Sequence, residues 1–200
     1  ASGRLGPGDV QWMTAAGGIV HEEKHSDAFT EQGGTLEMIQ LWVNLPASKK
    51  DISPSYQDIR ADDIPNVELP NSAGTLRVIA GHYNNTPGPA TTHTPMDVWD
   101  MQLGADATTA FDLPEGRNTT LVILRGSATI GDAELSPQQG VLLSQEGTTV
   151  TIGAGSDGAA VLVLSGDPID EPVAARGPFV MNSAQEIIQA MQDYHAGKMG

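Results

Sequence analysis

The pattern with the clearest chemical potential is a His-Glu-Glu run at residues 21–23. Side chains alternate between the two faces of a strand, so His21 and Glu23 are predicted to point the same way and Glu22 the opposite way. An imidazole and a carboxylate on one face suit iron, manganese, zinc or nickel, although such ions need further ligands to bind tightly. The alternative is a solvated run at the end of a strand, and the spacing alone leaves both open.

A second group of residues is placed to line a substrate cavity. Gln11, Trp12 and Met13 lie on the preceding predicted strand, and Gln40 and Trp42 lie on a later one. An aromatic ring beside an amide suits a flat organic substrate, because the amide can orient a hydroxyl group or dioxygen. The alternative is that both tryptophans pack in the core.

We expect short strands to position these residues, because Gly and Pro separate brief apolar runs along the sequence. Many short strands are typical of a barrel or a sandwich. One helix is expected in the tail, with Asn182 or Ser183 as its N-cap and Gly197 at its end. The expected strands cover residues 10–14, 19–23, 35–45, 75–81, 96–103, 118–125, 128–130, 140–144, 148–152 and 159–165.

The strand pattern predicts an all-β protein in two parts. Residues 47–70 have no sustained period and contain three prolines, so we interpret them as a connector. Residues 71–200 contain enough strands for a complete barrel with a closing helix. Residues 1–46 contain only three strands, which leaves the first barrel incomplete.

Composition narrows the function classes. Ten basic and 25 acidic side chains give a net charge of −15, which argues against direct binding to nucleic acid or to an anionic membrane. The longest apolar runs are far shorter than the ~20 residues of a membrane span. The chain has no cysteine, which excludes disulfides and a thiolate nucleophile and favours a reducing compartment, so we expect a cytoplasmic protein.

The run GDVQWMTAAGGIVHEE at residues 8–23 resembles the metal-site hairpin of the pirin family, whose members are two-domain cupins. The resemblance extends in order along nearly the whole chain, and several unrelated short signatures agree. They are GGTLEMIQLWVNLP at 33–46, YQDI at 56–59, RVIAG at 77–81, SGDPIDEPV at 165–173 and GPFVMN at 177–182.

The resemblance implies two cupin barrels with one metal ion, usually iron, in the N-terminal barrel. Pirins hold this ion with three histidines and one glutamate. His21 and Glu23 match two of these ligands, whereas the family's upstream His-x-His pair has no match in this sequence. The chain therefore resembles a pirin without the first strands of its metal barrel, either as a fragment or as a natural short form.

The resemblance also implies two alternative functions. Some relatives are described as flavonol dioxygenases that open quercetin with dioxygen; for such an enzyme we expect Glu23 to act as catalytic base on a small aromatic substrate. Other relatives bind transcription factors or metabolic enzymes, which implies a non-enzymatic regulatory module whose surface responds to the metal. A charge of −15 suits a protein partner with a basic face.

Overall fold

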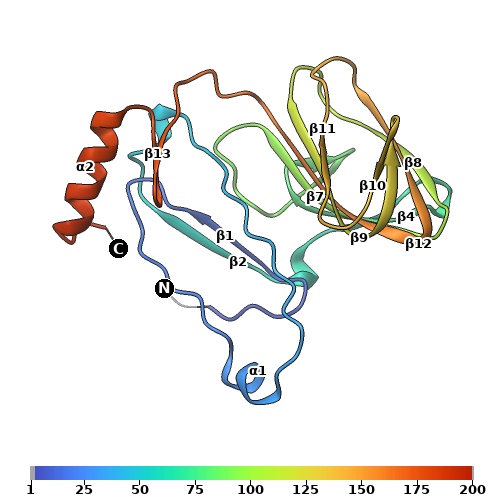
Figure 1. Cartoon of the computed structure of the whole chain (residues 1–200), viewed down its shortest axis with the longest axis horizontal. Coiled ribbons are helices and arrows are strands. Elements are labelled where there is room, and N and C mark those ends of the chain that lie inside the picture. Colours follow the sequence, from blue (N-terminus) through green and yellow to red (C-terminus); the bar gives the residue numbers. More distant parts are fainter. Residues whose placement is uncertain (1–2, 200) are drawn as a thin grey trace. The chain divides into compact units, whose positions relative to one another are not determined.

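The computed structural model describes residues 3–199, and strands dominate it (Figure 1). The backbone divides into two compact units. We call residues 6–10 and 59–168 the central unit, and residues 3–5, 11–58 and 169–199 the terminal unit. The predicted β class with a C-terminal helix is confirmed. Within residues 3–199, no helix combines the length and apolar character needed to cross a bilayer.

One antiparallel sheet builds the central unit. Its strands follow the order β10, β9, β12, β7, β4 and β3, while β11 also pairs with β9 and β8 also pairs with β12. The bounds are β3 (Asn66–Glu68), β4 (Gly74–Ala80), β7 (Met96–Leu103), β8 (Thr108–Asp112), β9 (Asn118–Ile130), β10 (Ala133–Leu135), β11 (Gly140–Leu142) and β12 (Thr149–Gly166). A small ribbon of β5 (His82–Tyr83) and β6 (Thr86–Pro87) and the 3-10 turns η2 (Ala61–Asp63) and η3 (Pro70–Ser72) complete the unit.

The longest strand, β12, connects this sheet because it pairs with β7, β8 and β9 (Figure 1). Its register with β9 shifts between Ala154 and Ala159, next to Gly158 at φ +76°. On β9, Gly126 has φ +68°, and a Cβ there would lie 2.0 Å from the Gly158 carbonyl oxygen. Glycine is required at this crossing, since no side chain fits between the two backbones.

The inward faces of four strands form the core of the central unit. Along β9, buried side chains recur at every second position, as expected for a strand with one covered face, whereas β4, β7 and β12 also contain runs of consecutive buried residues. The largest fully buried side chains are Trp99, Leu76, Met101, Leu121, Ile123, Ile152, Val78, Val161 and Val163.

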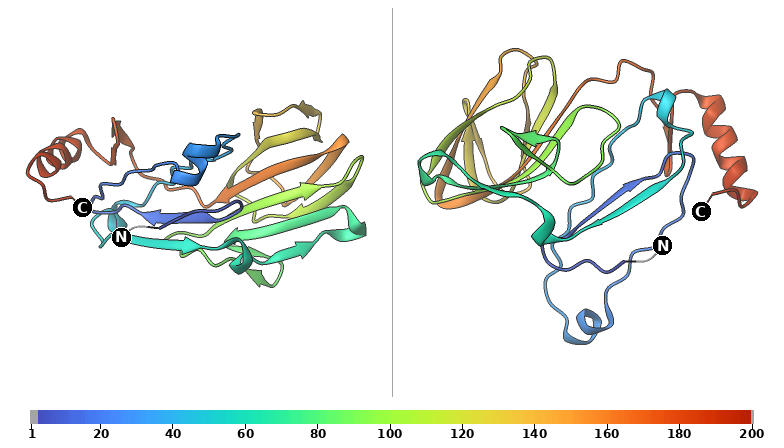
Figure 2. Two further views of the ribbon diagram at one scale, coloured as in Figure 1. Left: turned by 90° about the horizontal axis from the view of Figure 1, so that it is seen from below. Right: turned by 180° about the vertical axis from the view of Figure 1, so that it is seen from behind.

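The terminal unit contains two small sheets and two helices. β1 (Val10–Thr14) pairs with β2 (Ser55–Ile59), and β13 (Ala174–Arg176) pairs with β14 (Phe179–Met181). α1 (Asp27–Gln32) and the 3-10 turn η1 (Ala47–Lys49) lie between β1 and β2 in the chain. α2 (Ala184–His195) packs against β13 and β14, all in red in Figure 2.

The N-cap of α2 is the predicted one. Ser183 Oγ accepts a hydrogen bond from the backbone N–H of Glu186, and the Glu186 carboxylate accepts one from the backbone N–H of Asn182. This arrangement satisfies N–H groups that the first helical turn would otherwise leave unpaired.

Two of the predicted strands are wrong. Residues 19–23 and 35–45 follow an irregular path, and none of the strands in residues 3–199 pairs with them. Their composition favours extended structure, but a strand also needs a neighbour for its backbone hydrogen bonds. Their apolar side chains are consequently exposed, namely Val20, Leu36, Met38, Ile39, Leu41, Trp42 and Val43.

Other differences concern the ends of strands. The expected strands at 118–125 and 128–130 are the single strand β9, and those at 148–152 and 159–165 are the single strand β12. Gly126 in β9 and Gly158 in β12 have positive φ, yet each strand continues past its glycine. The sequence pattern had predicted that the strands end there. The sequence also missed α1 and the strands β5, β6, β8, β10, β13 and β14, as well as β2 and β3 within residues 47–70. The three-part division at residues 46 and 70 stays a prediction.

We predict that truncating a core leucine on β9 destabilises the protein strongly. Leu121 is 0% exposed, so Leu121→Ala should lower the free energy of unfolding by about 2–5 kcal/mol through lost burial and a residual cavity. The matched control is Leu142→Ala, because Leu142 on β11 is 71% exposed and its truncation should cost almost nothing. Urea denaturation of both variants measures the difference; equal losses would contradict this assignment of the core.

Candidate functional site

The His-Glu-Glu run lies in the irregular segment that follows β1. His21 Nδ1 is 3.7 Å from Glu23 Oε1, so these two side chains lie together. Glu22 turns to Lys24 instead, with 3.0 Å between the carboxylate oxygen and Nζ. Strand alternation would place His21 and Glu23 on one face. The two side chains are indeed adjacent, although their segment is not a strand.

This pair offers two donors to a metal ion. Both side chains are about two-fifths exposed, at 42% for His21 and 43% for Glu23. Among the residues that the structure describes, no group of three or more His, Asp or Glu is placed to hold an ion. Non-haem iron sites of the two-histidine, one-carboxylate type take three protein donors. The described residues therefore do not fit a complete iron centre, and the ligand role of His21 and Glu23 stays a prediction.

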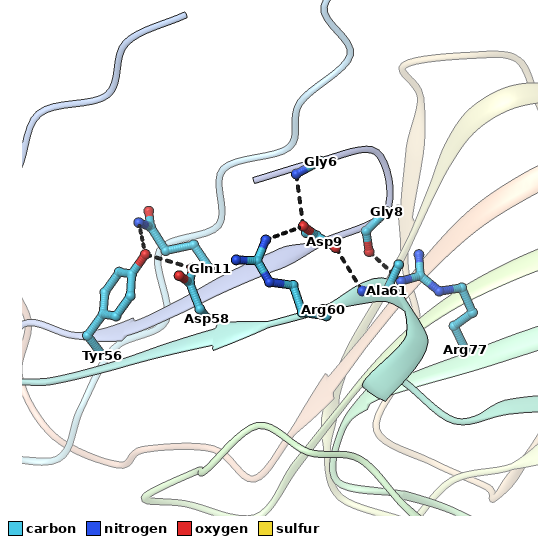
Figure 3. A network of polar contacts seen from close by, with 9 residues as sticks. All are labelled: Gly6, Gly8, Asp9, Gln11, Tyr56, Asp58, Arg60, Ala61 and Arg77. Atoms are coloured by element: carbon cyan, nitrogen blue, oxygen red, sulfur yellow. Dashed lines mark hydrogen bonds and ion pairs between the residues drawn. The ribbon is translucent and has the colours of Figure 1, made fainter. Parts of the chain in front are cut away.

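Next to this segment in the chain, β1 holds Gln11 against β2. Gln11 Nε2 donates to Tyr56 Oη at 2.9 Å, and Tyr56 Oη donates to Asp58 Oδ1 at 2.8 Å (Figure 3). Tyr56 and Asp58 are two residues apart on β2 and share one face. The result is a directed chain from amide to phenol to carboxylate that fixes the orientation of Gln11.

Tyr56 and Asp58 were not predicted as site residues, because residues 47–70 have the pattern of a connector. The signal that would have found them is the alternation in Ser-Tyr-Gln-Asp-Ile directly after Pro54. Such a short run is weak evidence for a strand unless its partner is known, and here the partner, β1, lies more than 40 positions earlier in the chain.

The remaining predicted cavity residues fall in two different settings. Trp12 and Met13 are half-buried on β1. Gln40 and Trp42 lie in the irregular segment 35–45, where Gln40 is exposed and Trp42 is 66% exposed. Core packing is therefore wrong for Trp42. The assignment of a common substrate cavity to Gln11, Trp12, Met13, Gln40 and Trp42 stays a prediction.

A buried lysine fixes the end of the segment that carries Gln40 and Trp42. Lys50 Nζ donates to Asn44 Oδ1 at 2.6 Å and to the Leu45 carbonyl oxygen at 2.5 Å. Burial lowers the pKa of Lys50, and the nearby carboxylate of Glu171 opposes that shift. The backbone at residues 44 and 45 is thus tied to one charged side chain.

An aspartate fixes the turn that leads into β1. Asp9 Oδ2 accepts from the Gly6 backbone N–H and from Arg60 Nη1, both at 2.8 Å, and Oδ1 accepts from the Ala61 backbone N–H at 2.8 Å (Figure 3). The bonds from the Gly6 and Ala61 N–H groups, followed by that from Arg60, lower the pKa of Asp9 to about 2. Nearby, Arg77 Nη2 donates to the Gly8 carbonyl oxygen.

Comparisons with known proteins match both parts of the chain. The sequence model of the pirin C-terminal cupin domain matches residues 98–200, and the pirin model matches residues 1–43. A Pseudomonas aeruginosa protein provisionally named a quercetin 2,3-dioxygenase is 52% identical over 99% of this chain and 69% of its own length. Human pirin is 32% identical over 100% of this chain and 68% of its own length.

A solved structure is similar as well. The crystal structure of a quercetin 2,3-dioxygenase from Acinetobacter baumannii superimposes with a TM-score of 0.92 at 44% identity, and it covers 96% of this chain and 67% of that protein. Together with the match to the pirin C-terminal cupin domain, this similarity confirms the predicted fold class.

We predict that Asp9 stabilises the fold in a pH-dependent way. The pKa of Asp9 is about 2 in the folded protein and 3.8 for an ordinary aspartate. Between these values the unfolded chain is more fully protonated than the folded one, so stability rises with pH. Asp9→Asn should therefore destabilise the protein at neutral pH, and the difference from wild type should vanish as the pH falls from about 4 to about 2.

Urea denaturation at a series of pH values measures this effect. Asp132→Asn is the matched control, because Asp132 is an exposed carboxylate in the turn between β9 and β10 and should leave the pH profile unchanged. A constant difference between Asp9→Asn and wild type down to pH 2 would contradict the assignment.

Proposed function

Because the chain belongs to the pirin family, we propose that it acts as a flavonol dioxygenase of the quercetin 2,3-dioxygenase type, with iron or another divalent transition metal. The observation that carries the proposal is the 3.7 Å approach of His21 Nδ1 and Glu23 Oε1, with Glu22 turned to Lys24. The names of the bacterial relatives support the reaction class. The absence of cysteine supports a cytoplasmic location.

In this proposal the residues of the chain divide the work. His21 and Glu23 are metal donors, and the metal supplies Lewis acidity when bound. Glu23 is also the catalytic base: its half-exposed carboxylate takes the proton of the flavonol hydroxyl group. The amide of Gln11, held by Tyr56, orients the substrate. The proposal requires metal donors beyond those in residues 3–199.

Metal binding gives the first test. With two protein donors, we expect the 200-residue chain to bind Ni²⁺, an air-stable probe, only weakly and to lose it on dialysis. Loss of a residue that only hydrogen-bonds to a metal ligand already weakens metal binding at least about tenfold. Because His21→Ala and Glu23→Gln remove the ligands themselves, each should weaken Ni²⁺ binding by at least that factor. Isothermal titration calorimetry measures the affinity.

Glu22→Gln is the matched control, since Glu22 is the neighbouring carboxylate and pairs with Lys24. It should bind Ni²⁺ as wild type does. The proposal fails if Glu22→Gln weakens binding as much as Glu23→Gln, or if neither His21→Ala nor Glu23→Gln has an effect.

Turnover gives the second test. We expect the isolated chain to show no flavonol dioxygenase turnover, because its donor set is too small. A chimera that adds the part of the Pseudomonas relative outside the match should bind about one iron per chain and release carbon monoxide from quercetin. Glu23→Gln in the chimera should abolish this release. Full metal occupancy and activity of the isolated chain would refute the argument.

One observation favours a second function, that of a regulatory module binding a protein. Leu36, Met38, Ile39, Trp42 and Val43 are each 46–66% exposed, and exposed apolar side chains gathered in one segment often mark an interaction site. Leu36→Glu combined with Met38→Glu should abolish partner capture from cell extract. If it also leaves quercetin turnover of the chimera unchanged, the module and the enzyme are separate functions.

A further inference from the structure

A cavity of about 420 Å³ opens in the central unit, away in sequence from every residue assigned to the proposed reaction. It is within the size range of small-molecule sites, which is about 300–1,000 Å³. Tyr83, Trp99 and Phe111 form its apolar part, with ring centroids 5.3 Å apart for Tyr83 and Trp99 and 5.7 Å apart for Trp99 and Phe111. Both pairs meet edge to face, so the three rings support each other as a rigid floor.

A buried ion pair forms a polar wall. Asp97 is 7% exposed; its Oδ2 accepts from Arg117 Nη1 at 2.5 Å, and its Oδ1 accepts from the His82 backbone N–H at 2.7 Å. Arg117 Nε donates to Asp167 Oδ1 at 2.8 Å. Both carboxylates hold the guanidinium in place, and Arg117 Nη2 takes part in neither bond.

Two residues that line this cavity have unused hydrogen-bonding capacity. Trp99 is 1% exposed, and its indole Nε1–H has no acceptor among the described residues. A buried donor without a partner is costly, and a ligand oxygen can remove that cost. At the rim, Asp112 is exposed; its Oδ1 accepts from Thr149 Oγ1 at 2.7 Å, which leaves Oδ2 available to a ligand donor.

Charge restricts the class of ligand. Two carboxylates, Asp97 and Asp112, line this cavity beside the single guanidinium of Arg117, which also pairs with Asp167, and the whole chain carries −15. This field repels anions. The carboxylates can accept hydrogen bonds from a ligand, and the guanidinium group and the indole N–H can donate them. A hydroxyl group fits this combination, because it both donates and accepts.

We propose that this cavity binds a small neutral ring with adjacent hydroxyl groups. The ring lies on the floor of Tyr83, Trp99 and Phe111, one hydroxyl group donates to Asp112, and a hydroxyl oxygen accepts from Arg117 Nη2 or Trp99 Nε1. The same chemistry occurs in a catechol and in a monosaccharide. The site does not depend on the proposed dioxygenase activity, because it shares no residue with it.

The test uses the full chain labelled with 5-fluorotryptophan. The chain has three tryptophans, so fluorine NMR gives three resonances, which Trp12→Phe and Trp42→Phe assign without altering the cavity. Catechol and glucose are titrated separately, with benzoate as the anionic comparison. We expect one of the two neutral probes to shift the Trp99 resonance alone and saturably, with a dissociation constant of about 1 mM or lower. The probe that does so shows whether the ligand is a catechol or a monosaccharide.

Asp112→Asn should weaken binding of that probe about tenfold, the effect of losing one charge-assisted hydrogen bond. Asp132→Asn removes an exposed carboxylate outside the cavity lining and should bind as wild type does. Thermal denaturation checks that both variants fold. The proposal is overturned if neither probe shifts Trp99, if benzoate binds as tightly, or if Asp112→Asn has no effect.

Discussion

The structure depends on one constraint: an extended segment becomes a strand only where another strand can take its hydrogen bonds. β12 meets this condition along its whole length, because β7, β8 and β9 all pair with it. Gly126 and Gly158 let the backbones approach closely while the sheet bends around its core. Residues 19–23 and 35–45 also contain strand-forming apolar residues but have no such neighbour among residues 3–199, and they stay irregular with their apolar side chains exposed.

The same constraint shapes the candidate site. β1 and β2 form only a two-stranded sheet, so the side chains around it are secured by polar anchors more than by a core. Asp9 ties the turn before β1 to Ala61 and Arg60, and Lys50 ties the backbone at residues 44 and 45. His21 and Glu23 sit between these anchors in the sequence, adjacent to each other but about two-fifths exposed.

Family membership and site geometry carry different information about this protein. Identity of 52% to a bacterial relative and a TM-score of 0.92 to a solved structure establish the fold and the family. They do not supply donors, and the described residues bring only an imidazole and a carboxylate together. The central unit differs, because its cavity is complete within that unit: a packed aromatic floor and a buried ion pair, both formed by residues of the folded sheet.

The sequence by itself determined what local periodicity controls. The expected ranges 10–14 and 96–103 are β1 and β7 to the residue, and Ser183 caps α2, because strand alternation and helix capping involve near neighbours. His21 and Glu23 also lie together, but residues 19–23 do not form the predicted strand, so strand alternation does not account for this contact. Only the tertiary structure decided which apolar segments find a partner strand, that Tyr56 holds Gln11, and that Arg117 reaches Asp97. These contacts join residues 20 to 45 positions apart, and no local pattern encodes a distance in space between such residues.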